Sequence, residues 1–131
     1  MVGRVVRYQF PLLAWIVTIF ALSSIPSIPE IQIPISPDKI AHAGIYFVLC
    51  LFWKRALTHQ DRFAWLRDHA LGAAVGLSIL HGILDEVYQL NVPGRWADPY
   101  DAVADAVGAG LFAAWALWKG RRSTGTAKDL T

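Results

Sequence analysis

Ionisable and polar side chains interrupt apolar sequence between His81 and Asp105, and they are of types that transfer protons, hold cations or bind polar ligands. Apolar runs lie on both sides of this segment, over 70–80 and 106–118. The polar residues of the segment are His81, Asp85, Glu86, Gln89, Arg95, Asp98, Asp101 and Asp105. Charged groups are costly in a protein core or in lipid and tend to be retained for what they do, so this segment is the predicted functional site.

The spacing of the polar residues predicts three helical faces at one end of a bundle. On each face the residues recur at intervals of three or four positions, which places them on one side of a helix. The three sets are Asp38, His42 and Tyr46; His81, Asp85 and Gln89, with Glu86 further round the same side; and Asp98, Asp101 and Asp105. Because polar faces are unfavourable against lipid, we expect them to face one another around a polar pocket about 10 Å deep.

Three of these residues also have structural explanations. Asp98 precedes Pro99 and is expected to cap a helix, although a capping residue can bind a ligand as well. Histidines such as His42 and His81, taken singly, are more often hydrogen-bonded core residues than catalysts. However, many ionisable groups lie at one end of a small bundle. A purely structural role does not explain so many of them, which favours a functional site.

Arg95 has two alternative roles. Its planar guanidinium suits a phosphate or carboxylate ligand, which it would contact at two points. Alternatively, it neutralises buried carboxylates, and we expect it to lie within ion-pair distance of Glu86, Asp98 or Asp101. We also expect His42 to face the third or the fourth helix.

The composition favours a membrane protein. Of 131 residues, 55% are hydrophobic and 17% charged, which departs from the average of soluble domains. The run from Tyr8 to Ile25 carries no charge and is apolar on every side, as a membrane span is and a surface helix is not. A soluble four-helix bundle is the structural alternative, and a cleaved signal peptide ending near Ala21-Leu22-Ser23 is the alternative for the first run. The single cysteine, Cys50, excludes an internal disulfide.

Three further helices are predicted, over 37–57, 69–90 and 99–118. Ser36 before Pro37 and Asp98 before Pro99 are typical helix openings. Residues 26–37 contain four prolines and are expected to form a loop, 58–68 a loop or short surface helix, and 91–94 a tight turn with Gly94 at positive φ. Residues 1–120 are therefore predicted to form a single domain, and 121–131 a polar, disordered tail.

The basic residues indicate the orientation of these spans. Of the 12 Lys and Arg residues, only Lys39 and Arg95 fall at the end that carries the predicted site. By the positive-inside rule, both termini lie in the cytoplasm and the site faces outward. The fold predicted from the sequence is thus an all-α, four-helix transmembrane bundle, a multi-pass protein of the inner (plasma) membrane with both termini cytoplasmic.

The polar residues together resemble a family signature. The pattern is Asp38-Lys39-x-x-His42-x-x-x-Tyr46, followed by Asp85-Glu86-x-x-Gln89-x-x-x-Pro93-Gly94-Arg95-x-x-Asp98-x-x-Asp101-x-x-x-Asp105-x-x-Gly108. It resembles the VanZ-like family of small bacterial membrane proteins, named after a member associated with low-level resistance to the glycopeptide teicoplanin. The resemblance implies a four-span protein with a role in the cell envelope and names no reaction. The position of Asp105 is often Asn in that family, so this chain carries an additional carboxyl group there.

Two classes of function follow from these residues. The first is binding or modulation of a lipid-linked or cell-wall-related headgroup in the outer pocket, with hydrogen bonds from Gln89 and Tyr46. The second is a membrane-embedded enzyme, an acid/base or metal-assisted hydrolase or transferase acting on a lipid headgroup. No cofactor is required, although a divalent metal such as Zn²⁺ or Mn²⁺ is an alternative; its candidate ligands are His42, His81, Asp85, Glu86, Asp101 and Asp105.

Further classes are less favoured. An ion-coupled carrier would use the same intramembrane acids but normally has more spans. A structural membrane adaptor would need none of them. The expected partners are the lipid bilayer and a lipid-linked cell-wall precursor. Nucleic acid is not expected, because the basic residues are scattered over the ends of the spans.

Overall fold

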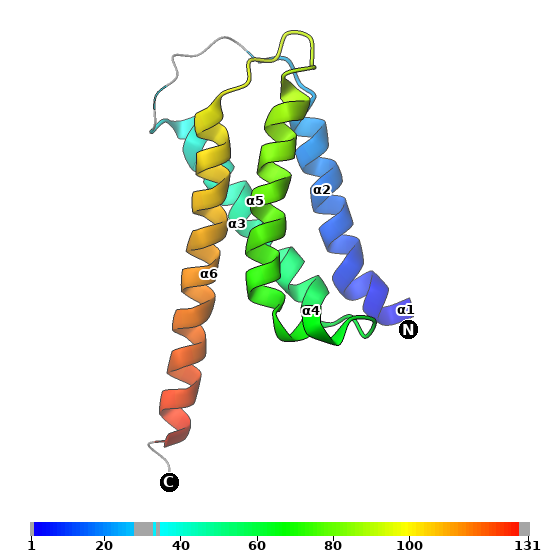
Figure 1. Ribbon diagram of the computed structural model, residues 1–131, viewed down its shortest axis with the longest axis vertical. Helices are drawn as coiled ribbons and strands as arrows, with labels where there is room; N and C mark the ends of the chain where they lie inside the picture. Colours follow the sequence, from blue (N-terminus) through cyan, green and yellow to red (C-terminus); the bar gives the residue numbers. More distant parts are fainter. Residues whose placement is uncertain (1, 28–32, 34, 129–131) are drawn as a thin grey trace.

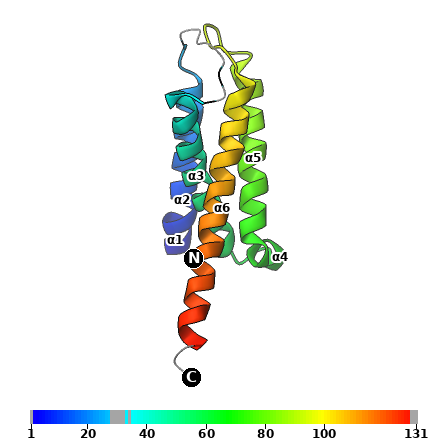
Figure 2. The same ribbon diagram turned by 90° about the vertical axis from the view of Figure 1, so that its left-hand side faces the viewer.

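The protein is a bundle of long helices with its two termini toward the same end (Figures 1 and 2). The computed structural model describes residues 2–27, 33 and 35–128, with side chains as far as residue 124. In this part of the chain there is no strand. The elements are α1 (Val2–Arg4), the π-helical turn η1 (Val5–Gln9), α2 (Phe10–Ser23), α3 (Pro37–Thr58), α4 (Ala64–Asp68), α5 (Ala70–Gln89) and α6 (Pro99–Lys128).

Four segments are long and apolar enough to cross a membrane. They are Val2–Ser23, Pro37–Thr58, Ala70–Gln89 and Pro99–Thr124. Large apolar side chains on the outside of the bundle, such as Val17, Leu84 and Leu111, are about half exposed or more, which suits contact with lipid tails. The predicted all-α fold with four membrane-spanning helices is confirmed.

The first span begins earlier than predicted. Its helix starts at Val2 rather than near Tyr8 and passes through η1 before α2. Contacts with the region after α3 hold these first turns: the Tyr8 ring stacks on His59 at 3.8 Å, and Arg4 forms an ion pair with Asp61 at 2.5 Å. Sequence periodicity could not predict these contacts, because they join segments far apart in the chain.

The predicted helix openings are confirmed at both positions. Ser36 is extended, and its Oγ accepts a hydrogen bond from the backbone N–H of Lys39 at 3.4 Å, so that α3 begins at Pro37. The Oδ1 of Asp98 accepts from the N–H of Tyr100 at 2.9 Å, just inside α6. These caps fix where α3 and α6 begin, and the ion pairs of Lys39 with Asp98 and Asp101 join the two first turns.

The connections agree with the sequence in part. Gly94 has a φ of 74°, as predicted for the tight turn after α5. Within the predicted segment 58–68, the structure contains the short helix α4. The loop predicted over 26–37 includes residues 28–32 and 34, which lie outside the described part of the chain.

Helix α3 lies at the centre of the bundle and packs against α2, α5 and α6. Its closest approach is to α6 at Gly108, where a Cβ atom would stand 2.1 Å from the carbonyl oxygen of Ala43. The apolar cores on its two sides are Cys50, Leu57, Ala70, Ala74, Ala109 and Phe112, and Leu12, Ile19, Tyr46, Leu49 and Ala56. The α3–α6 pair is thus the most tightly packed part of the fold, and it carries much of the site.

The predicted end of the fourth helix near Trp118 is wrong. Helix α6 continues to Lys128 and projects beyond the other helices (Figure 1), where a disordered tail was expected from residue 121. Extending an existing helix adds a hydrogen bond for each residue fixed, and cations near its carboxyl end are favourable. The Arg122 guanidinium also lies over the Trp118 ring, 4.1 Å from its centroid. Residues 129–131 of the predicted tail lie outside the described part.

Candidate functional site

The predicted site residues lie mainly in the first half of α3, the second half of α5 and the first turns of α6, which point to the end of the bundle opposite the termini (Figures 1 and 2). This end is built from the first turns of α3 and α6 and the last turns of α2 and α5. Despite their charge or polarity, seven of the residues are buried: Lys39, Tyr46, Asp85, Gln89, Asp98, Asp101 and Asp105. The structure decides which of these residues pair.

Lys39 is the buried counter-charge of the site. Its Nζ donates to Asp98 Oδ2 at 2.5 Å and to Asp101 Oδ1, and it lies 3.4 Å from Asp38 Oδ2. Only 8% of Lys39 is exposed. Lys39 was a predicted site residue, but this pairing was assigned to Arg95. The adjacent openings of α3 and α6 bring the lysine to the two carboxylates.

Arg95 does not form the ion pair predicted for it. Among the described residues it pairs with no carboxylate; its Nη1 donates to the carbonyl oxygens of Ile25, at 3.0 Å, and Leu22, at 3.5 Å. The last carbonyls of a helix lack partners within it and attract cations, which explains why the arginine lies at the end of α2. Arg95 therefore fastens the α5–α6 connection to α2, while its Nε is buried without a hydrogen-bond partner in the described structure.

His42 faces the fourth helix, as predicted. Its Nδ1 lies 2.9 Å from Asp105 Oδ1, and its Nε2 lies 3.6 Å from Asp101 Oδ2. Asp105 is only 1% exposed, and its other oxygen lies against α5 at Gly82, where a Cβ atom would come within 2.9 Å. A carboxylate that hydrogen-bonds one ring nitrogen of a histidine fixes the orientation of the ring, an arrangement used in acid/base and metal sites alike.

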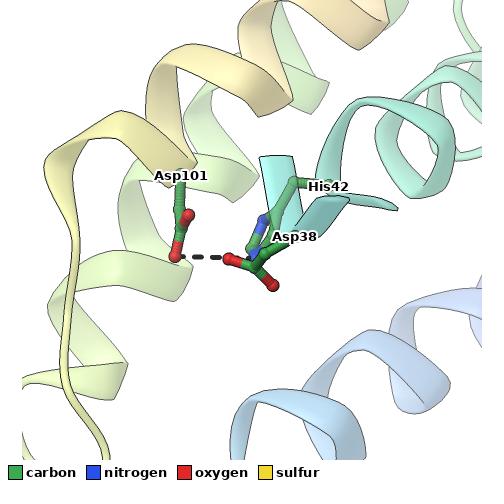
Figure 3. A group of neighbouring side chains, drawn as sticks. All are labelled: Asp38, His42 and Asp101. Carbon is green, nitrogen blue, oxygen red and sulfur yellow. Dashed lines mark ion pairs between the residues drawn. The ribbon is translucent and has the colours of Figure 1, made fainter. Parts of the chain in front are cut away.

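Asp38, His42 and Asp101 form a group able to hold a metal ion. Figure 3 shows the three side chains pointing toward one another from α3 and α6. One ligand atom from each lies within 4.8 Å of the others. Imidazole nitrogen and carboxylate oxygens suit Zn²⁺ or Mn²⁺. However, the Lys39 ammonium already bonds to two of the same carboxylates, so a metal ion would compete with it.

Asp85 connects α5 to α2 through a partner that sequence reasoning missed. Its Oδ2 accepts from Ser23 Oγ at 2.7 Å and from Gln89 Nε2 at 3.1 Å. A second contact joins the same two helices: the hydroxyl of Ser24, which follows Ser23, lies 2.7 Å from the hydroxyl of Tyr88. The signal in the sequence is a pair of hydroxyl residues at the end of an uncharged span, on the same side of the membrane as the acids.

Several buried polar atoms at this end have no hydrogen-bond partner in the described structure. Besides Arg95 Nε, they are the Tyr46 hydroxyl, Glu86 Oε1, Gln89 Oε1 and Asp105 Oδ2. Tyr46 is 1% exposed and lies beside His81, with 5.9 Å between ring centroids. An unsatisfied buried polar group costs about 1–3 kcal/mol, which is why such groups usually contact water or a ligand. The four atoms thus indicate that this end of the bundle holds water or a polar ligand.

Asp85 lines two hollows. One, of about 50 Å³, is lined by the polar residues Ser23, His42, Tyr46, Asp85 and Arg95 together with the apolar residues Ile19, Leu22 and Ile45. The other, of about 370 Å³, runs between α2 and α5 and is lined mainly by apolar side chains of Ile16, Val17, Phe20, Leu84 and Tyr88, with His81 and Asp85 at its wall. We call these the polar cavity and the lateral groove. The described part of the site is thus a network of paired side chains with a small cavity beside it, rather than a deep open pocket.

Comparisons of the chain with protein-family models, with curated proteins and with solved structures find no match. The resemblance to the VanZ-like family therefore rests on the spaced polar residues alone. The geometry described above carries the argument for function.

Proposed function

We propose that the protein is an integral membrane protein of the cell envelope that binds the polar headgroup of a membrane lipid, and that it is of the VanZ-like type. The ligand class we favour is a lipid-linked cell-wall precursor. Such a ligand is consistent both with a site in the membrane and with the role in the cell envelope that the resemblance implies. Tolerance to glycopeptides such as teicoplanin is then the expected phenotype.

The observation that carries this proposal is that Asp85 lines both the lateral groove and the polar cavity. In a bilayer the lateral groove faces hydrocarbon, because its wall is formed by the exposed apolar side chains Val17, Phe20 and Leu84. The polar cavity lies around Asp85, which is the residue that both linings share. A molecule that fills both has a hydrocarbon tail and a polar head, which is the description of a lipid.

The chemistry of the polar cavity favours a phosphate or carboxylate group next to a hydroxyl or amide. Arg95 offers an unpaired Nε–H, and the Tyr46 hydroxyl is free to donate. Asp85 also lines the cavity and accepts hydrogen bonds. A volume of about 50 Å³ admits a group of a few heavy atoms, so the remainder of the headgroup lies outside the cavity.

The first prediction concerns lipid that co-purifies with the protein. Val17→Trp places a large side chain in the lateral groove, and it should lower the amount of bound lipid about tenfold or more, since each methylene removed from contact costs about 0.8 kcal/mol. Mass spectrometry of the purified protein measures this directly. Arg95→Lys should stay folded but retain less lipid, because lysine lacks the planar fork.

The matched control is Leu111→Trp, which adds the same side chain to an exposed position of α6 outside the groove. It should retain wild-type lipid. Equal retention by Val17→Trp and Leu111→Trp would contradict a tail in the groove. Undiminished retention by a folded Arg95→Lys variant would contradict recognition of the headgroup by Arg95.

The second prediction concerns orientation. We propose that both termini lie in the cytoplasm and the site faces outward, since Lys39 and Arg95 are the only basic residues at the site end. Reporter fusions after residue 131 and within 58–68 should be active in the cytoplasm, and fusions within 26–37 outside it. A C-terminal fusion active in the periplasm would reverse the assignment and move the site to the cytoplasmic face.

An enzyme acting on a lipid headgroup is the second candidate, and the His42–Asp105 contact is the observation in its favour. The contact orients the ring, which is what a general base or a metal ligand requires. With Asp38 and Asp101 nearby, the same histidine suits a metal-assisted hydrolase or transferase. Elemental analysis of the purified protein separates the two candidates: about one equivalent of bound metal favours the enzyme, and a metal-free protein with bound lipid favours the binding protein.

A further inference from the structure

A second hollow suited to a lipid lies between α3 and α6, toward the end that carries the termini. It has a volume of about 430 Å³. Its inner wall is apolar, formed by Leu51, Phe112, Trp115 and Ala116, and its rim carries Lys54, Arg55 and Lys119. We call it the basic groove. It shares no residue with the polar cavity or the lateral groove.

The wall of the basic groove is held in place by aromatic packing. The Phe47 ring meets Phe112 edge to face at 5.4 Å between centroids, and it lies 6.3 Å from Trp115. Phe112 is almost completely buried, whereas Trp115 is 42% exposed. The groove therefore has a rigid base and an open apolar side that faces the surroundings of the bundle.

The rim of the basic groove is positively charged and has no acidic residue among its lining. Within the described residues, neither Lys54 nor Lys119 forms an ion pair. The Lys119 ammonium instead lies over the Trp115 ring, 5.1 Å from its centroid. An anion that reaches the rim thus meets cations that no carboxylate neutralises.

The position of the rim along the bundle matches a headgroup layer. Lys54 is fifteen residues after Lys39 on α3, or about 22 Å at 1.5 Å per residue. This is a large part of the roughly 30 Å hydrocarbon thickness. Since Lys39 lies at one polar end of the spans, the rim lies near the other, with the aromatic wall at the depth of lipid tails.

We propose that the basic groove is a binding site for an anionic phospholipid. One acyl chain lies along Phe112 and Trp115, and the phosphate is held by Lys54 and Lys119, with Arg55 beside them. A second copy of the chain is a poorer occupant, because a two-fold contact through this face would bring two basic rims together. The site is independent of the headgroup site at the opposite end.

The test uses the full-length protein in detergent, stripped of lipid and titrated with phosphatidylglycerol or phosphatidylcholine, with binding followed by native mass spectrometry. The wild type should bind one phosphatidylglycerol in preference to phosphatidylcholine. Lys54→Gln/Lys119→Gln should weaken this binding about thirtyfold, since two near-surface cations are lost. The control Arg62→Gln/Arg67→Gln removes two cations from the same end outside the groove and should bind as the wild type does.

A third variant separates a defined site from general attraction to negative charge. Ala116→Trp keeps every cation and fills the groove, so it should lose the bound phosphatidylglycerol. Equal loss in the Arg62→Gln/Arg67→Gln control, or full binding by Ala116→Trp, would overturn the proposal. So would equal binding of phosphatidylcholine, or of glycerophosphoglycerol, which has the headgroup without the tails.

Discussion

Gly108→Ala should destabilise the bundle by about 3 kcal/mol or more, although it adds a single methyl group. The new Cβ would stand 2.1 Å from the carbonyl oxygen of Ala43 and 2.8 Å from its carbonyl carbon. These atoms belong to the backbone of α3, so no side-chain rotation relieves the clash. The two helices must move apart. Their first turns, which hold Lys39 against Asp101, then move apart as well. In detergent, the thermal midpoint should fall by about 10 °C or more.

The matched control lies two residues further along the same helix. A Cβ at Gly110 meets nothing within 4 Å. Gly110→Ala should therefore be neutral or stabilise the helix by up to about 1 kcal/mol, because alanine has less backbone freedom to lose. If both variants melt at the same temperature as the wild type, α3 and α6 are not in the contact described here.

Lys39→Met should cost about 3–5 kcal/mol, the range for removing one partner of a buried ion pair. Methionine is similar to lysine in length and fills the space, so the effect is one of charge. It leaves Asp98 and Asp101 buried without their shared cation. The fall in free energy of unfolding, measured by chemical denaturation in detergent, checks the expectation.

Two further variants distinguish charge from shape at this position. Lys39→Arg keeps the cation and should be much less destabilised than Lys39→Met. Adding Asp98→Asn and Asp101→Asn to Lys39→Met removes the unpaired charges and should restore most of the stability. A Lys39→Met protein as stable as the wild type would show that the lysine is not the counter-charge of these carboxylates.

The sequence was sufficient for the main elements of the fold. Uncharged apolar runs predicted the spans, and Ser36-Pro37 and Asp98-Pro99 predicted where two helices begin. Both signals are local: a run of apolar residues or a capping side chain acts within a few residues of its own position. The polar spacing on three helices likewise predicted which end of the bundle is polar.

The ends of the terminal helices were less predictable. The π-helical turn before α2 and the continuation of α6 past Trp118 both contradict the boundaries expected from composition. Polar sequence at the end of a helix is compatible with helix or coil. The position of the helix end depends on whether hydrogen bonds and contacts, such as that of Tyr8 with His59, extend the helix. Composition does not predict these contacts.

The amino-acid sequence by itself thus determined an all-helical chain with four apolar spans and one polar end, because periodicity and capping are properties of each helix alone. Only the tertiary structure decided the pairing within that end: Lys39 rather than Arg95 holds Asp98 and Asp101, and Ser23 reaches Asp85. The spacing of residues on one helix shows which side chains share a face, but not how that helix is rotated and how closely it approaches its neighbours. That depends on contacts between segments far apart in the chain, such as Gly108 against Ala43.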